Sequence, residues 1–151
     1  MLVRSFAAAL ALAMFSSAAG AAADVVNDYS TPNGDWRGQA QFHARVGSNF
    51  DPKAHSVSDL AISIDPQGKV TGVSSGTGCR ALGLAVPSGP KTVFNLDVTF
   101  TGCSHPGYNQ RYSGNLFLYP RDSYASLRLR SYRIDPTSKS VSYDVRATLK
   151  R

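Results

Sequence analysis

The sequence predicts an all-β fold, in which about eight antiparallel strands follow one another as a meander. Three observations predict it. Apolar and polar residues alternate with a period of two in most segments, which is typical of half-buried strands. Short turns rich in Pro, Gly and Asp separate these segments. No segment has a sustained helical period, and the chain contains no Glu, which is a strong helix former.

The first residues indicate export. One positive charge precedes the apolar run Ser5–Ser16, and small residues then lead to Ala21–Ala23 before Asp24. A charged, an apolar and a small-residue region in this order are typical of a secretory signal peptide. The apolar run is shorter than the roughly 20 residues that a membrane-spanning helix needs. We therefore expect residues 1–23 to be a cleaved signal peptide, with no transmembrane segment after cleavage and a periplasmic or secreted location.

The rest of the chain divides into an irregular lead-in, residues 24–34, and a single β domain, residues 35–151. The first strand is the clearest, because a strict alternation begins at Trp36 and continues to Val46. Residues 47–56 are expected to form a loop, with or without a helical turn.

Seven further strands are expected after this loop. Their spans, in chain order, are residues 60–64, 69–74, 80–86, 94–100, 112–118, 125–130 and 141–149. In the strand over 94–100, the side chains of Phe94, Leu96, Val98 and Phe100 are expected to face the core. Strands joined by short connections pair with their neighbours, so the long first and last strands would meet to close a small barrel. A barrel-like sandwich of two sheets fits the same pattern.

Cys79 and Cys103 are the two cysteines of the chain, and we expect them to form a disulfide because an exported protein meets an oxidising compartment. A hairpin centred on residues 87–90 would not place them opposite each other. The bridge therefore requires a longer loop, a bulge, or a connection from a loop to the end of a strand.

Basic residues point to an anionic partner. The formal net charge is +6, and arginines gather in the C-terminal third, where Arg128 and Arg130 share one face of a strand. Guanidinium groups bind phosphate, sulfate and carboxylate groups through paired hydrogen bonds. The candidate anionic-ligand surface consists of Arg111, Arg121, Arg128, Arg130, Tyr132 and Arg133. The alternative is a solvated face on which arginine pairs with Asp144.

No metal, cofactor or catalytic residue is assigned from the sequence. His43, His55 and His105 do not stand at the spacing of metal ligands. Ser, His and Asp are plentiful, but no combination of them nominates a nucleophile. We therefore expect a non-enzymatic exported binding or interaction protein, whose partner is an anionic glycan, lipopolysaccharide or another protein. The alternatives are a hydrolase with dispersed catalytic residues, or an inhibitor of a host or bacterial enzyme.

Three resemblances accompany this interpretation. Residues 78–79, 100–103 and 108–116 together resemble a group of small exported proteobacterial proteins without an assigned activity, which implies export and a β fold but no site. The Gly-x-Trp at residues 34–36 resembles the opening of the barrel in calycins, which implies that Trp36 plugs one end. Residues 111–127 resemble periplasmic lysozyme inhibitors of the small β-barrel type, although the flanking cysteines differ from theirs; this resemblance implies inhibition of an enzyme.

Overall fold

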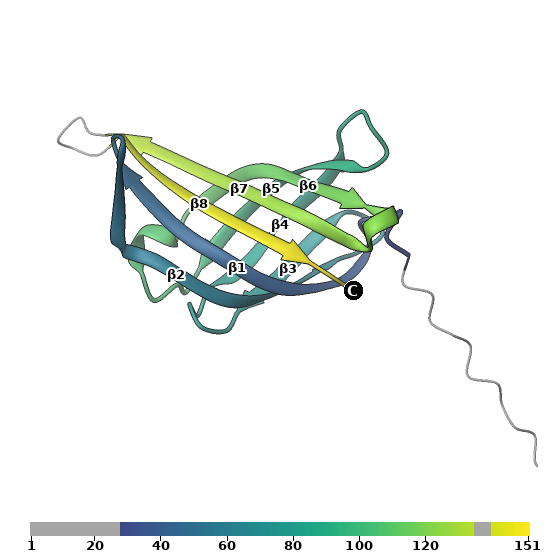
Figure 1. Ribbon diagram of the computed structural model, residues 1–151, viewed down its shortest axis with the longest axis horizontal. Helices are drawn as coiled ribbons and strands as arrows, with labels where there is room; N and C mark the ends of the chain where they lie inside the picture. Colours follow the sequence, from purple (N-terminus) through teal and green to yellow (C-terminus); the bar gives the residue numbers. More distant parts are fainter. Residues whose placement is uncertain (1–27, 135–139) are drawn as a thin grey trace, which may run out of the picture.

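A computed structural model describes residues 28–134 and 140–151, and in this part of the chain eight antiparallel strands form a closed barrel. Figure 1 shows β1 and β8 side by side, where pairing between the two strands closes the barrel. The strands are β1 (Gly34–Val46), β2 (Asn49–Ile64), β3 (Lys69–Ser74), β4 (Arg80–Pro87), β5 (Val93–Thr101), β6 (Arg111–Tyr119), β7 (Tyr124–Ile134) and β8 (Ser140–Leu149). The all-β prediction is confirmed, and closure excludes the two-sheet sandwich.

Two parts of the sequence-based prediction lie outside this description. The expected signal peptide, residues 1–23, precedes the described residues, and the side chains of Tyr132 and Arg133 are likewise not described. Within the described residues, no helix is long and apolar enough to cross a membrane.

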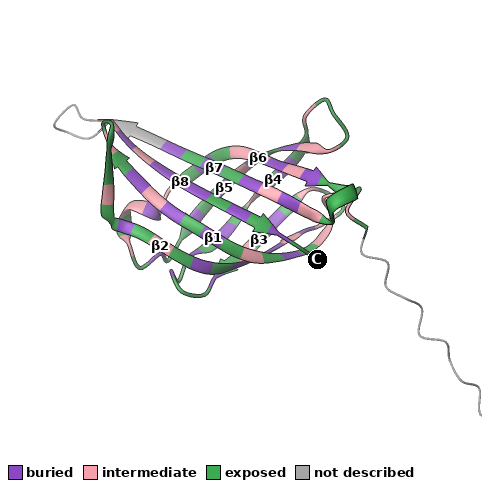
Figure 2. Cartoon of the chain, viewed as in Figure 1, coloured by how far each residue is buried: buried purple, intermediate pink, exposed green. Residues whose placement is uncertain are grey.

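The interior of the barrel is a packed hydrophobic core. Burial alternates along the strands, as Figure 2 shows, because successive side chains point to opposite faces of a sheet. The residues expected to face inward from β5 are all buried, which confirms their predicted orientation: Phe94, Leu96, Val98 and Phe100. Large aromatic side chains from several strands and one loop pack with them, and the largest of these that are fully buried are Trp36, Tyr108, Tyr112 and Phe42.

β4 presents its larger apolar side chains to solvent. The alternation that locates this strand consists of Leu82, Leu84 and Val86, and each of these side chains is more than half exposed. The small residues Ala81 and Ala85 face the interior instead, where they lie opposite Phe100 and Leu96 of β5. Large side chains on one strand leave room only for small ones on its neighbour, since a core is filled to a fixed density.

The loop expected over residues 47–56 is wrong in most of its length. β2 begins at Asn49, and its first residues pair with the end of β1 after a register shift between Phe42 and Ala44. Pro52 is compatible with a strand here because β3 pairs only with residues 60–64 of β2, so the other edge of this segment carries no ladder.

The disulfide joins Cys79 and Cys103 as predicted, with Cα atoms 4.1 Å apart. The two cysteines lie just outside the paired strands, because β4 begins at Arg80 and β5 ends at Thr101. The strands pair in register, and the bridge forms between the loops that extend beyond them. The connection therefore needs no bulge within the paired strands.

Trp36 and the C-terminal residue cover the opposite end of the barrel. The indole is fully buried and donates a hydrogen bond from Nε1 to the carbonyl of Pro32, 2.7 Å away. The guanidinium of Arg151 lies 4.4 Å from the centre of the indole ring, and the ring of Tyr29 meets it edge-on. Tyr29 and Arg151 thus pack on the buried indole through an aromatic ring and a cation.

Candidate functional site

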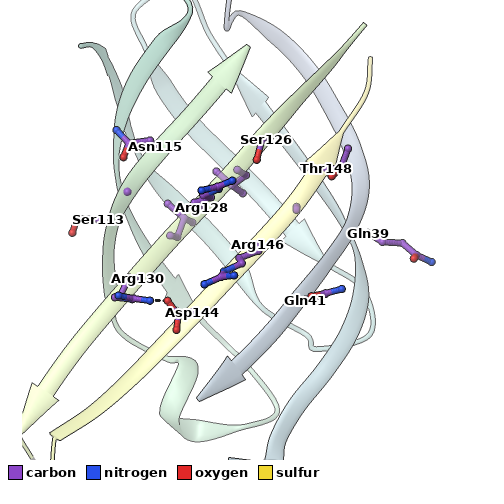
Figure 3. A pocket seen from close by; sticks show the side chains of 14 residues that line it. Gln39, Gln41, Ser113, Asn115, Ser126, Arg128, Arg130, Asp144, Arg146 and Thr148 are labelled. Carbon is purple, nitrogen blue, oxygen red and sulfur yellow. Dashed lines mark hydrogen bonds and ion pairs between the residues drawn. The ribbon is translucent and has the colours of Figure 1, made fainter. Parts of the chain in front are cut away.

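A groove of about 590 Å³ lies on the outer surface of the barrel, over β6, β7, β8 and β1. Figure 3 shows that the side chains reaching it come from four neighbouring strands. The polar and charged residues that line it are Gln39, Gln41, Ser113, Asn115, Ser126, Arg128, Arg130, Asp144, Arg146 and Thr148. Its lining therefore combines three arginines, one carboxylate and several neutral hydrogen-bonding groups.

Strand register places two arginines directly against each other at the middle of the groove. Arg128 of β7 is the pairing partner of Arg146 of β8. The same row continues to Asn115 of β6 on one side and to Gln41 of β1 on the other. Directly opposite side chains lie only about 5 Å apart at their Cβ atoms, so both guanidinium groups can reach one ligand.

The neighbouring row is an ion-pair network. Arg130 lies opposite Asp144, and its Nε donates a hydrogen bond to Oδ1 at 2.6 Å. The carboxylate is almost fully buried, and its Oδ2 lies 3.5 Å from Nε2 of His43 on β1 without a hydrogen bond. The alternative that the sequence suggested was the pairing of arginine with Asp144, and Arg130 forms this pair.

Burial lowers the pKa of His43, and the nearby cations Arg146 and Arg45, together with His55, lower it further. The carboxylate of Asp144 acts in the opposite direction. The imidazole is therefore held toward its neutral form beside a carboxylate that Arg130 already neutralises.

Arg128 and Arg146 have no acidic partner within residues 28–134 and 140–151, and both side chains are exposed. The guanidinium of Arg128 lies 5.8 Å from the ring centre of Phe117, on the adjoining strand. An aromatic face holds a cation without neutralising it. These two arginines therefore form a positive centre that stays uncompensated in the described structure.

The predicted anionic-ligand surface is only partly assembled. Arg128 and Arg130 line the groove, but Arg130 serves Asp144. Arg111 pairs instead with Asp97 on β5 at an adjoining part of the surface; this pairing lowers the pKa of the carboxyl and raises that of the guanidinium. Arg121 is exposed in the short 3-10 helix Pro120–Asp122, at the turn between β6 and β7.

Sequence reasoning missed Arg146 as a member of the site. The candidate anionic-ligand surface drawn from the sequence did not include it. The signal was the antiparallel pairing of two consecutive strands, β7 and β8, which places Arg128 opposite Arg146. Gln41 and Asn115 do not follow from this pairing, since Gln41 is placed by the pairing of β1 with β8 and Asn115 by the pairing of β6 with β7.

The histidines do not form a metal site in the described residues, where no group of three His, Cys, Asp or Glu side chains could hold an ion. His43 lies beside Asp144, and His55 is exposed on β2 near the ring of Phe50. His105 caps the 3-10 helix Pro106–Tyr108, where its Nδ1 accepts a hydrogen bond from the backbone of Gly107.

One Gly-x-Ser-x-Gly pentapeptide, residues 72–76, bears on the hydrolase alternative. Its central Ser74 is almost fully buried at the end of β3. The hydroxyl donates to Oγ of Ser58 and accepts from the hydroxyl of Thr77. A nucleophile elbow needs an exposed serine on a turn from a strand to a helix. Ser74 is instead part of a buried hydroxyl network that supports the turn between β3 and β4.

Comparison with known proteins found no protein-family model, curated protein or solved structure that matches this chain.

Proposed function

We propose that this chain is an exported, non-enzymatic protein that binds an anionic ligand in the groove over β6, β7, β8 and β1. The observation that carries the proposal is the pair Arg128 and Arg146, which lie directly opposite each other without an acidic partner in the described residues. The ligand supplies the negative charge that this pair lacks.

Electrostatics supports this assignment. Like charges directly opposite each other on paired strands destabilise a sheet. A ligand carrying sulfate, carboxylate or phosphate removes that repulsion and accepts hydrogen bonds from both guanidinium groups. The carboxylate in the groove does not compete for the pair, because Arg130 donates to Asp144. The amide and hydroxyl groups around the pair can bind the uncharged parts of the same ligand.

The export part of the proposal rests on the first 23 residues and on the cysteines. The charged, apolar and small-residue regions have the order of a signal peptide. The disulfide between Cys79 and Cys103 is compatible with an oxidising compartment.

Binding of heparin to the mature protein tests the function. The variant Arg128→Gln/Arg146→Gln removes the uncompensated charge while keeping long polar side chains. We expect a salt-dependent affinity for wild type, and a loss of at least about tenfold in the variant, the scale of losing charge-assisted hydrogen bonds. Calorimetric titration at two salt concentrations measures both effects.

The matched control is Arg37→Gln/Arg80→Gln, which removes the same charge from exposed positions on β1 and β4, outside the groove. This control should lose less than about threefold, because screening over roughly 8–10 Å weakens distant charges. Equal losses in both double variants would mean that net charge, not the groove, attracts heparin. Absence of binding by wild type at low salt would overturn the function itself.

A further inference from the structure

We propose that the ligand of the groove is an acidic polysaccharide that lies along the β6–β7 hairpin, with one sugar ring on Tyr119 and Tyr124 and charged groups on Arg128 and Arg146. This inference rests on the proposed function, and it deepens that function by naming the ligand class and a second contact region. We call Tyr119 and Tyr124 the tyrosine pair.

The tyrosine pair belongs to the same outer face as the arginines. Tyr119 and Tyr124 are pairing partners next to the turn, and Asn115 and Arg128 are partners further along the same two strands. Alternate residues of a strand share one face. Along the hairpin, starting from the turn, this outer face therefore carries three successive pairs: the two tyrosines, then Phe117 with Ser126, then Asn115 with Arg128. The hairpin therefore presents aromatic rings at one end and cations at the other.

The two tyrosine rings form a preformed platform. Their centres are 4.5 Å apart, their planes differ by 13°, and Tyr119 is partly exposed. An aromatic face carries negative charge density and attracts the positively polarised C–H groups on the face of a sugar ring. Stacking of the rings on each other fixes their orientation before a ligand arrives, which lowers the entropy cost of binding.

The spacing indicates a chain rather than a single sugar. Tyr124 and Arg128 are four residues apart on β7, which corresponds to roughly 13 Å along the strand. A ligand that contacts both must extend over that distance. Ser126 lies between these two contact points and Asn115 lies directly opposite Arg128, so a hydroxyl and an amide are available for the hydroxyl groups of a polysaccharide.

A sugar polymer fits this surface better than a nucleic acid strand. Proteins that bind single-stranded nucleic acid offer successive aromatic platforms and a cationic groove that follows the phosphates. On this hairpin the tyrosine pair is one platform. The next ring along the same outer face is Phe117, and the guanidinium of Arg128 lies over that ring. Within the groove, the cations without an acidic partner among the described residues are Arg128 and Arg146, and most of the other polar groups that line it are neutral.

The test compares a heparin-derived oligosaccharide, an oligogalacturonate, inorganic tripolyphosphate and single-stranded DNA as probes. Tripolyphosphate carries the anionic charge without a sugar ring. The two glycans distinguish sulfate from carboxylate as the charged group. The variants are Tyr119→Ala, which removes one ring of the pair, and Tyr119→Phe, which keeps it. Phe50→Ala is the matched control, because it removes an exposed ring from β2, away from the groove.

We expect Tyr119→Ala to lose about fivefold or more in affinity for at least one glycan, on the scale of one stacked ring. The affinity of Tyr119→Ala for tripolyphosphate should stay within about twofold of wild type. The affinities of Tyr119→Phe and Phe50→Ala for the glycan should also stay within about twofold of wild type. This pattern would support the proposal. The arginine double variant should lose affinity for both classes of probe.

Three results would overturn the inference while leaving the anion-binding function in place. They are an unchanged glycan affinity in Tyr119→Ala, an equal loss for tripolyphosphate, and tighter binding of DNA than of either glycan with the same dependence on Tyr119. Absence of salt-dependent binding by every probe would instead remove the proposed function, and the inference with it.

Discussion

Asp144 is the residue that divides the groove into two parts with different roles. Its carboxylate is buried, and it takes a hydrogen bond from Arg130 while His43 lies beside its second oxygen. Removing Arg130 would leave a buried carboxylate without its main partner, which is costly in itself. Arg130 is therefore a poor choice for testing ligand binding, and Arg128 with Arg146 is the better pair.

His43 should make stability fall as the pH drops below about 6.5, the usual pKa of an imidazole. Burial lowers the pKa of its imidazole below the usual 6.5, so the unfolded chain binds the proton more readily than the folded one. The stability contributed by neutral His43 is fully present above pH 6.5 and is lost as the pH falls toward the folded pKa. We expect urea denaturation to show a falling free energy of unfolding over this interval.

His43→Gln should flatten that pH dependence, because the variant has no group that titrates at this position. His55→Gln, which removes an exposed imidazole from β2, is the matched control and should behave like wild type. Asp97 and Asp28, whose carboxyl pKa values are also lowered, lose their contribution only below about pH 4 and do not interfere. Parallel pH profiles for wild type and His43→Gln would contradict the assignment.

Among the elements, β4 and β5 differ in which face carries their large side chains. β5 points its large side chains into the barrel, whereas β4 points small residues inward and its leucines outward. The two strands pair along their length, so the same interior space is filled mainly from β5. A similar apolar alternation therefore places large side chains in the core in β5 and in solvent in β4, so the large side chains of the two strands contribute differently to stability.

Substitutions in these strands should show the difference. Phe100→Ala should lower the free energy of unfolding by roughly 3–5 kcal/mol, because it removes a buried ring and leaves a cavity. Leu84→Ala should cost less than about 1 kcal/mol, because that side chain is more than half exposed. Urea denaturation of both variants measures the costs. A similar cost for the two would mean that the faces of β4 are reversed.

At the scale of the whole molecule, the closed barrel is secured at its two ends by different means. One end carries the disulfide and the cluster of Phe42, Phe100 and Tyr108, in which each ring contacts another edge-on or tilted. The other end carries Trp36 beneath the guanidinium of Arg151. The groove lies on the side of the barrel between them, on strands that pair without interruption.

The disulfide should contribute substantially to this stability. Cys79→Ser/Cys103→Ser is expected to lower the free energy of unfolding by roughly 3 kcal/mol, because the bridge restricts a loop of the unfolded chain. Intact mass with and without reductant establishes whether the purified protein carries the bond, and it also tests the proposal that residues 1–23 are removed on export. Free thiols in that protein, or a reduced form as stable as the oxidised one, would contradict the prediction.

The strands themselves could be predicted from the sequence because their signals are local. Alternation with a period of two and turn residues such as Asp65–Gly68 need no knowledge of distant parts of the chain. The start of β2 was missed because an unpaired strand edge accepts Pro52, and the pairing of an edge is not visible in one segment. The arginine patch was found in part, from the spacing of Arg128 and Arg130 on one strand.

By itself, the sequence determined the strand order, the inward face of β5 and the pairing of the two cysteines, since each follows from spacing along the chain or from residue type. Only the tertiary structure decided that the barrel closes, which face of β4 is inside and which arginines remain uncompensated. Those features depend on register between strands and on the volume that opposing side chains leave. Register brought Arg146 against Arg128 and Asp144 against Arg130, and so separated the pair of arginines without an acidic partner in the described residues from the ion pair.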